Sequence, residues 1–176
     1  FGNYIFHIGS NLNRKNRQNI VLSFKKSNFS RNGYLVFAGS RLDKTISEIV
    51  CNEKVSEKVI DLGEVSFADL NILYSGSSSF IFPSFSEGFG WPVIEAQASG
   101  TPVICSNTES LNEVGKLGTI QIDPHDVTEI SRVVDMLSDN LSTRKDLIEE
   151  GFLNLEKFCS KKMFISYLKL IGNIKS

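Results

Sequence analysis

Residues 83–103, PSFSEGFGWPVIEAQASGTPV, decide the fold of this chain. The apolar residues 80–82 just before them predict the end of a buried strand, and the glycine-bracketed residues 87–91 predict a loop. Residues 92–99, with proline in the first turn, predict a helix, and residues 101–105 predict the next strand. A loop between a parallel strand and a helix N-terminus suits anionic ligands, because free N–H groups and the helix dipole point there.

Two carboxylates lie in this segment, Glu87 in the predicted loop and Glu95 in the predicted helix. Carboxylates accept paired hydrogen bonds from sugar hydroxyls, so two of them beside an anion-binding loop suit a nucleotide-sugar. The same pair also fits a solvated loop residue and a residue that compensates the helix dipole. The two residue types alone leave both interpretations open.

The surrounding residues resemble the signature of glycosyltransferase family four, PS-x-x-EGFG-x-P-x-x-EA-x-A-x-G-x-PV. Members of this family are retaining enzymes of the two-domain GT-B fold, and they need no metal. The resemblance implies that Glu87 is the catalytic residue, in contact with the donor sugar near the reacting carbon. It also implies that Glu95 binds the ribose hydroxyls, and that the nucleobase lies against the backbone near Glu64 and Val65.

A sugar-nucleotide donor leaves as a nucleoside diphosphate, so its site must stabilise the negative charge that develops on the phosphates. The backbone N–H groups of Gly88, Phe89 and Gly90 are one source of positive charge, since glycine lets a backbone approach a ligand closely. The basic pair Arg14 and Lys15, after the first predicted strand, is a second source. We predict that these five residues bind the donor.

The family pattern after the first strand resembles G-R-x-x-x-x-K-[GN], with both basic residues on the diphosphate. In this chain Lys15 matches the lysine of the pattern, whereas Ser10 stands in place of the arginine. Either Arg14 supplies the second cation from a neighbouring position, or Ser10 binds phosphate as a neutral donor. We favour Arg14.

For two ring-bearing residues, Trp91 and His7, we favour a structural role over a functional one. Trp91 can stack on a ligand, but an aromatic residue beside a helix start is expected to pack into the domain. His7 lies in an apolar run, so we expect a core residue and assign it no functional role.

Length and composition predict one well-buried domain over residues 1–176, because the chain is 41% hydrophobic and too short for two ordinary domains. A net charge of −1 argues against a nucleic-acid partner. The three cysteines, Cys51, Cys105 and Cys159, lack metal-ligand spacing and predict incidental thiols in a reducing compartment. We expect no metal and no cofactor. The reducing compartment favours a cytoplasmic protein. No run approaches the ~18 apolar residues of a membrane span, so we expect any contact with the cytoplasmic face of a membrane to be made by a part outside this chain.

Strand and helix patterns alternate six times along the chain, which predicts a Rossmann-like α/β domain. Its parallel sheet should have about six strands, with helices on both faces, and the resemblance implies the C-terminal half of a GT-B enzyme. Capping-box patterns at Ser66 with Asp69, and at Asp126 with Glu129, mark two helix starts. Strands are predicted over 4–8, 34–38, 58–62, 80–82, 101–105 and 119–122, and helices over 18–26, 42–51, 66–74, 92–99, 111–114, 126–137, 143–158 and 161–171.

The leading hypothesis is therefore the donor-binding half of a retaining hexosyltransferase, mannosyltransferases included, that acts on a glycan or lipid-linked acceptor. Because the chain opens at Phe1 without methionine, we expect a fragment whose acceptor-binding N-terminal domain is missing, and which binds donor without catalysis. The alternatives are a stand-alone subunit that pairs with a separate acceptor-binding protein, and a non-catalytic nucleotide-binding module. A dinucleotide oxidoreductase is disfavoured, because no G-x-G-x-x-G follows the first strand.

Overall fold

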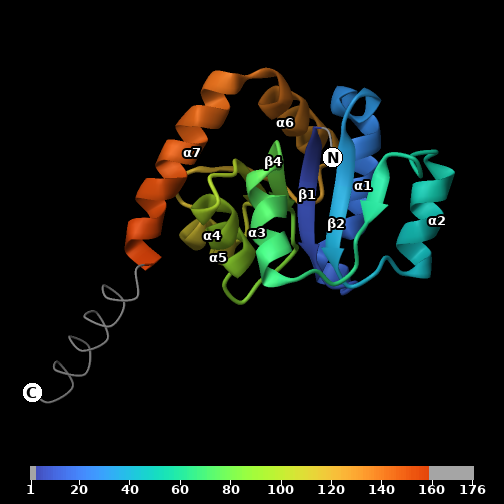
Figure 1. The fold of residues 1–176 in the computed structure, drawn as a ribbon, viewed down its shortest axis with the longest axis horizontal. Helices are drawn as coiled ribbons and strands as arrows, with labels where there is room; N and C mark the ends of the chain where they lie inside the picture. Colours follow the sequence, from blue (N-terminus) through green and yellow to red (C-terminus); the bar gives the residue numbers. More distant parts are fainter. Residues whose placement is uncertain (1–2, 159–176) are drawn as a thin grey trace, which may run out of the picture.

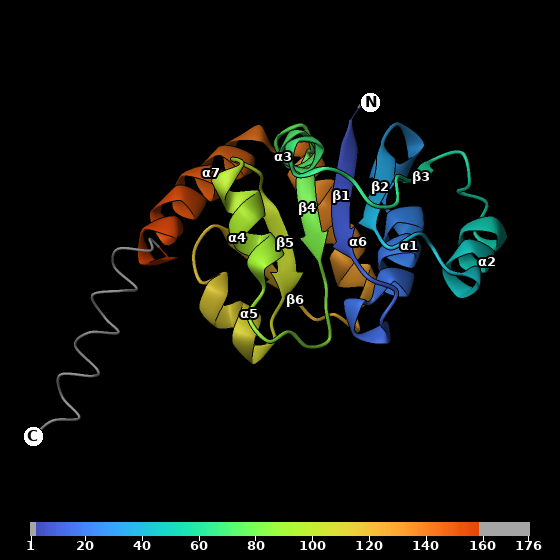
Figure 2. The ribbon, with the colours of Figure 1, turned by 60° about the horizontal axis from the view of Figure 1, so that its bottom comes forward.

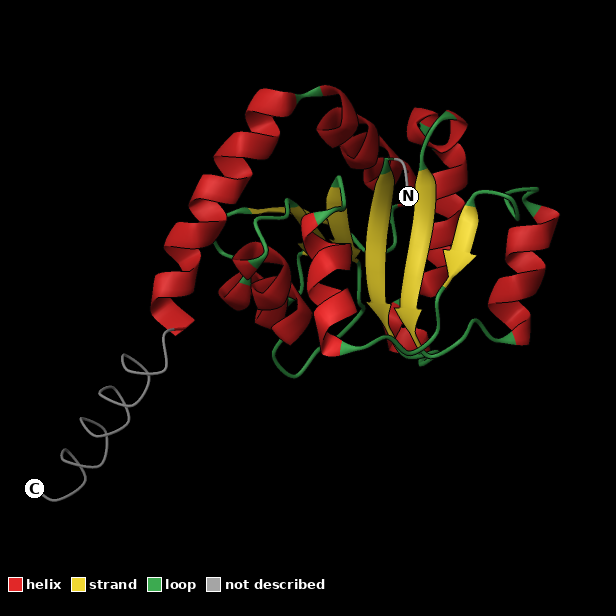
Figure 3. Ribbon diagram, viewed as in Figure 1, coloured by secondary structure: helices red, strands yellow, loops and turns green. Residues whose placement is uncertain are grey.

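A computed structural model describes residues 3–158 of the chain and shows a single parallel sheet within them. Its six strands lie in the order β3-β2-β1-β4-β5-β6, with helices on both sides (Figures 1 and 3). The predicted Rossmann-like α/β fold class is confirmed. The strands are β1 (Tyr4–Gly9), β2 (Tyr34–Gly39), β3 (Val59–Asp61), β4 (Ser79–Phe82), β5 (Val103–Ser106) and β6 (Thr119–Ile122).

The helices of the described part fall where the periodicity predicts them, with ends that differ by a few residues. The predicted helix over 161–171 and Cys159 lie outside the described residues. The α-helices are α1 (Arg17–Lys26), α2 (Lys44–Asn52), α3 (Phe67–Ser75), α4 (Trp91–Ala98), α5 (Glu109–Val114), α6 (Val127–Asp139) and α7 (Leu141–Leu155), and the 3-10 turns are η1 (Asn13–Lys15), η2 (Asn28–Arg31) and η3 (Glu156–Phe158).

Both faces of the sheet are buried, which explains why its strands are continuous apolar runs. Along β1 the side chains alternate: Ile5 packs with residues of α1, α2 and α6, whereas Phe6 packs with residues of α3, α4 and α5. Figures 1 and 2 show these two groups of helices on opposite sides of the strands. None of the helices in residues 3–158 is long and apolar enough to cross a membrane.

The two predicted capping boxes form their first halves in the structure, but their returning halves differ from the prediction. At α3 the Ser66 hydroxyl accepts from the N–H of Asp69, and the Asp69 carboxylate accepts from the same hydroxyl at 2.6 Å, where a capping box would have it accept from the backbone N–H of the cap residue. At α6 the Asp126 side chain caps the N–H of Glu129, but the Glu129 carboxylate accepts from the N–H of Asp123. The returning half of that box was predicted wrongly, because the Asp126 N–H already donates to the Asp123 carbonyl.

The strand order places a topological switch point between β1 and β4, the two central strands. From β1 the chain proceeds outward to β2 and β3, and from β4 it proceeds the other way to β5 and β6. At such a point the loops after the two strands diverge and leave a crevice at the carboxyl edge of the sheet, where ligands of this fold class bind. The loops after β1 and β4 therefore define where the candidate site lies.

Candidate functional site

A charged cluster joins the loops after β1 and β4. Lys15 Nζ donates to Glu87 Oε1 at 2.6 Å, and Arg14 Nη1 donates to Glu87 Oε2 at 2.6 Å. The side chains of Glu87 and Lys15 are only 8% and 11% exposed, whereas that of Arg14 is 41% exposed. We call Arg14, Lys15 and Glu87 the switch-point cluster. With two cations and one carboxylate, it carries one net positive charge at the crevice.

The burial of Glu87 favours its neutral form, but the surrounding donors reverse that effect. Burial raises the pKa of Glu87, while the hydrogen bonds from Lys15 and Arg14, together with the charge of Lys15, lower it. The net result is a pKa below the usual range of a glutamate. Glu87 is therefore a carboxylate at neutral pH, and it can accept hydrogen bonds but not donate them.

Asn16 places the basic pair, and the residue patterns above did not single it out. Its backbone is left-handed, with φ of 56°, where η1 ends and α1 begins. Its side-chain amide donates to the carbonyls of Pro83 and Pro124, which fixes the first loop against the loops after β4 and β6. A signal was present: the [GN] alternative in the family pattern names the two residues that most readily adopt a left-handed backbone.

Arg17 is a second residue that the sequence reasoning missed. It is the first residue of α1, is buried, and donates to the carbonyls of Gly9, Ala38 and Ser40 at 2.6, 2.9 and 2.8 Å. It also donates to the Asn11 side chain at 2.7 Å. Arg17 thus holds together the carboxyl ends of β1 and β2 and the start of the loop that carries Arg14 and Lys15.

His7 lies below the cluster in β1 and is fully buried, as predicted for a core residue. Its Nδ1 lies 2.9 Å from the Ile81 carbonyl, which can only accept, so the proton is on Nδ1 and joins β1 to β4. Burial lowers the pKa of His7; the hydrogen bond with Ile81 opposes this effect, and the charges of Arg17 and Lys15 add to it, with a net pKa of about 3. His7 is therefore neutral at physiological pH.

The two glycines of the loop after β4 have different physical roles. Gly90 has φ of 110° and precedes α4, and a Cβ there would lie 2.5 Å from the Leu111 side chain. A Cβ on Gly88 would meet nothing within 4 Å. Packing and backbone conformation therefore require glycine at position 90, whereas at position 88 glycine leaves open space beside the backbone.

Trp91 corrects an expectation, because it does not pack into the domain. It is 56% exposed, and its ring lies 4.7 Å from that of Phe89 on the surface. Helix α4 buries Val93 and Ala96. Since residue 91 is two positions before residue 93, it lies roughly 200° around the helix from it and points outward.

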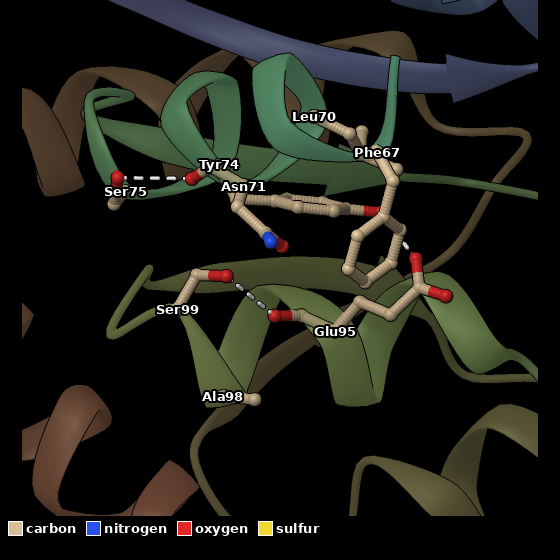
Figure 4. Close-up of a pocket in the computed structure, with 8 residues that line it drawn as sticks. All are labelled: Phe67, Leu70, Asn71, Tyr74, Ser75, Glu95, Ala98 and Ser99. Atoms are coloured by element: carbon tan, nitrogen blue, oxygen red, sulfur yellow. Dashed lines mark hydrogen bonds between the residues drawn. The ribbon is translucent and has the colours of Figure 1, made fainter.

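Glu95 lies in a second region, a pocket of about 470 Å³ between α3 and α4. Tyr74 Oη donates to Glu95 Oε2 at 3.0 Å, and Figure 4 shows Glu95 extending toward the Phe67 ring. Phe67 is 75% exposed and borders the opening. We call this the α3–α4 pocket; its lining residues are Phe67, Leu70, Asn71, Tyr74, Ser75, Glu95, Ala98 and Ser99.

The remaining predicted residues lie apart from these two regions. Val65 follows β3 and lines another pocket, of about 510 Å³, together with Leu62 and Ile72. Ser10 is partly exposed at the start of the loop after β1. Among residues 3–158 no group of three or more His, Cys, Asp or Glu side chains could hold a metal ion.

Comparison with known proteins identifies the class. Residues 2–153 match the family Glycosyl transferases group 1, and the chain belongs to that family. The O-antigen chain mannosyltransferase RfbU of Salmonella typhimurium is 36% identical over 124 residues, which cover 70% of this chain and 35% of that protein. The O-antigen chain mannosyltransferase B of Escherichia coli is 33% identical over 160 residues, which cover 88% of this chain and 42% of that protein. The chain thus spans less than half the length of these curated relatives.

A solved structure confirms the architecture. The crystal structure of Anabaena Alr3699/HepE in complex with UDP and glucose superimposes with a TM-score of 0.87, at 13% identity, over 97% of this chain and 48% of that chain. At this identity the likeness shows the fold alone. It agrees with the prediction that the chain folds as one half of a GT-B protein.

Proposed function

We propose that this chain binds the nucleotide-sugar donor of a retaining hexosyltransferase. The names of the two relatives favour a mannosyl donor and a role in polysaccharide or lipopolysaccharide synthesis. The acceptor, a glycan or a lipid-linked sugar, would be held by an N-terminal domain or a separate subunit. The lengths of the relatives support such a further part, since the matched region is a minor share of each.

The observation that carries this proposal is the convergence of Arg14 and Lys15 on Glu87 at the switch point. A nucleoside diphosphate placed in the crevice would meet both cations and the N–H groups before α4. These groups stabilise the charge that develops as the diphosphate leaves, so the reaction that we propose needs no metal and no cofactor. As the partner of Lys15 at the diphosphate, Arg14 is supported over the neutral donor Ser10, because the Arg14 guanidinium reaches the same carboxylate as Lys15.

The two carboxylates have separate roles in this proposal. Glu87 faces the transferring sugar from beside the diphosphate site, and acts as the catalytic residue that contacts the sugar near the reacting carbon. Glu95 accepts hydrogen bonds from the ribose in the α3–α4 pocket, with the nucleobase near Val65. Gly88, with open space around its α-carbon, leaves the donor access to the loop backbone.

Calorimetry with UDP-, GDP- and ADP-hexoses, in the presence of a chelator, tests the proposal on this chain. At least one donor should bind without added metal, and the same nucleoside diphosphate should bind without its sugar. If a folded chain binds none of them, the donor-site assignment is wrong. Transfer assays with the full-length protein then separate an enzyme from the alternative, a non-catalytic nucleotide-binding module.

A further inference from the structure

We propose that Tyr74 is a positioning residue, which holds the Glu95 carboxylate in the orientation that receives the ribose diol of the donor. The proposal rests on the donor-binding function above and deepens it. Tyr74 is buried at the wall of the α3–α4 pocket, and its hydroxyl acts through Glu95, to which it is hydrogen-bonded. Figure 4 shows the two side chains meeting between α3 and α4.

The surroundings of Tyr74 fix the place of its hydroxyl. Its ring packs edge-on against Phe6 and Phe80, with ring centroids 5.2 and 5.1 Å away. Its backbone carbonyl accepts from the hydroxyls of Thr101 and Ser77, at 2.7 and 2.8 Å. A buried ring between two others has little rotamer freedom, so the hydroxyl is a fixed point against which the flexible Glu95 side chain is held.

The direction of the hydrogen bond determines what the pocket can bind. Burial raises the pKa of Tyr74, and the charge of Glu95 and the hydrogen bond to it raise it further. The hydroxyl therefore stays protonated and donates to Oε2, which leaves Oε1 as an acceptor for a ligand. An acceptor carboxylate attracts hydroxyl donors and repels phosphate. The α3–α4 pocket thus suits a diol, and the phosphates of the same ligand belong at the switch-point cluster.

The test is calorimetric binding of whichever nucleoside diphosphate among UDP, GDP and ADP the parent chain binds most tightly. Tyr74→Phe keeps the ring and removes only the hydroxyl, and it should weaken binding roughly three- to tenfold. In a Glu95→Gln background the same change should have no further effect. The 2′,3′-dideoxy form of the ligand should bind Tyr74→Phe and the parent equally, because it lacks the ribose hydroxyls that donate hydrogen bonds to Glu95.

Tyr34→Phe is the matched control. Tyr34 is the first residue of β2, at the amino end of the strand and away from the carboxyl-edge crevice, and its ring packs against Lys58 Nζ at 4.9 Å. Removing its hydroxyl should leave nucleotide affinity unchanged. A loss of affinity in Tyr34→Phe equal to that in Tyr74→Phe would mean that the loss of any tyrosine hydroxyl has the effect, and would overturn the proposal.

The other outcomes separate the proposal from the function on which it rests. If the parent binds no nucleoside diphosphate, the donor-binding function fails. If the parent binds and Tyr74→Phe binds as tightly, Tyr74 does not position Glu95. The same conclusion follows if the Tyr74→Phe change lowers affinity as much in the Glu95→Gln background as in the parent. Should Tyr74→Phe fail to fold, Glu95→Asp replaces it as the test, because it withdraws the carboxylate from the Tyr74 hydroxyl by one methylene. Its affinity for the nucleoside diphosphate should fall by a similar factor. Unchanged affinity would contradict the proposal.

Discussion

The switch-point cluster and the α3–α4 pocket each present one glutamate, and they hold it by different means. Glu87 accepts from two cations in a nearly buried setting, and its pKa is lowered. Glu95 accepts from one neutral, buried hydroxyl, that of Tyr74. The first region is therefore cationic overall and suits phosphate, whereas the second remains an acceptor and suits hydroxyl groups. In the function proposed above, these two residues of the same type would bind different parts of one ligand.

The first test of this comparison removes the cations. Lys15→Ala should weaken binding of a nucleoside diphosphate about ten- to a hundredfold, since a hydrogen bond to a charged group contributes roughly 1.5–3 kcal/mol. Arg14→Ala should cost less, because its more exposed side chain is better screened. Calorimetry with the free nucleoside supplies the control, together with Lys44→Ala on the exposed face of α2. Equal loss for nucleoside and diphosphate would show that the cations do not face the phosphates.

The second test acidifies the protein, because His7 and Glu87, whose pKa values are lowered, both lie at the junction of β1 and β4. His7 has a pKa of about 3 in the folded chain and about 6.5 when unfolded, so the unfolded state binds the extra proton. Its contribution to stability is complete above about pH 6.5 and is lost as the pH falls toward 3.

Denaturant unfolding at several pH values measures that loss. The free energy of unfolding should fall with a slope of about 1.4 kcal/mol per pH unit below 6.5 from His7 alone. His7→Phe should flatten this slope whatever it does to stability at neutral pH. An unchanged slope in His7→Phe would show that the buried, neutral histidine is not the group that takes up the proton.

The third test varies salt. Raising ionic strength shortens the Debye length, which is about 10 Å at 0.1 M, so the affinity for a nucleoside diphosphate should fall several-fold between low and moderate salt. The effect of Tyr74→Phe, expressed as a ratio to the parent, should stay the same across that series because a neutral hydroxyl is lost. A salt-independent affinity would argue that the phosphates are held by backbone N–H groups alone.

Much of the fold follows from the residue pattern, because buried parallel strands must be apolar on both faces and helices must carry caps. Tyr34–Gly39 and Thr119–Ile122 are examples of strands predicted within a residue of their ends. The residue pattern alone does not show that Glu87, Lys15 and Arg14 form one cluster. Loops after strands were identifiable, but only the strand order shows that β1 and β4 are neighbours.

The supporting residues were not predictable by the same reasoning. Tyr74 fits a helix as an ordinary apolar position, and its partner Glu95 lies 21 residues later on another helix. Arg17 resembles any basic residue in a polar stretch, although three carbonyls from the ends of β1 and β2 surround its guanidinium. Such roles depend on which segments meet in space. Trp91 shows the converse error, since its residue type suggested burial while its angular position on α4 decided its exposure.

Glu87 and Glu95 should bind different parts of the donor, and paired calorimetry with a sugar nucleotide and its bare nucleoside diphosphate measures this division. Glu95→Gln should weaken both ligands by a similar factor, about tenfold. Glu87→Gln should weaken only the sugar nucleotide, and should leave the bare diphosphate bound as tightly or roughly two- to fivefold more tightly, because Arg14 and Lys15 no longer pair with a carboxylate. If Glu87→Gln weakens the bare diphosphate as much as the sugar nucleotide, Glu87 does not bind the sugar, and the two carboxylates do not divide the donor between them.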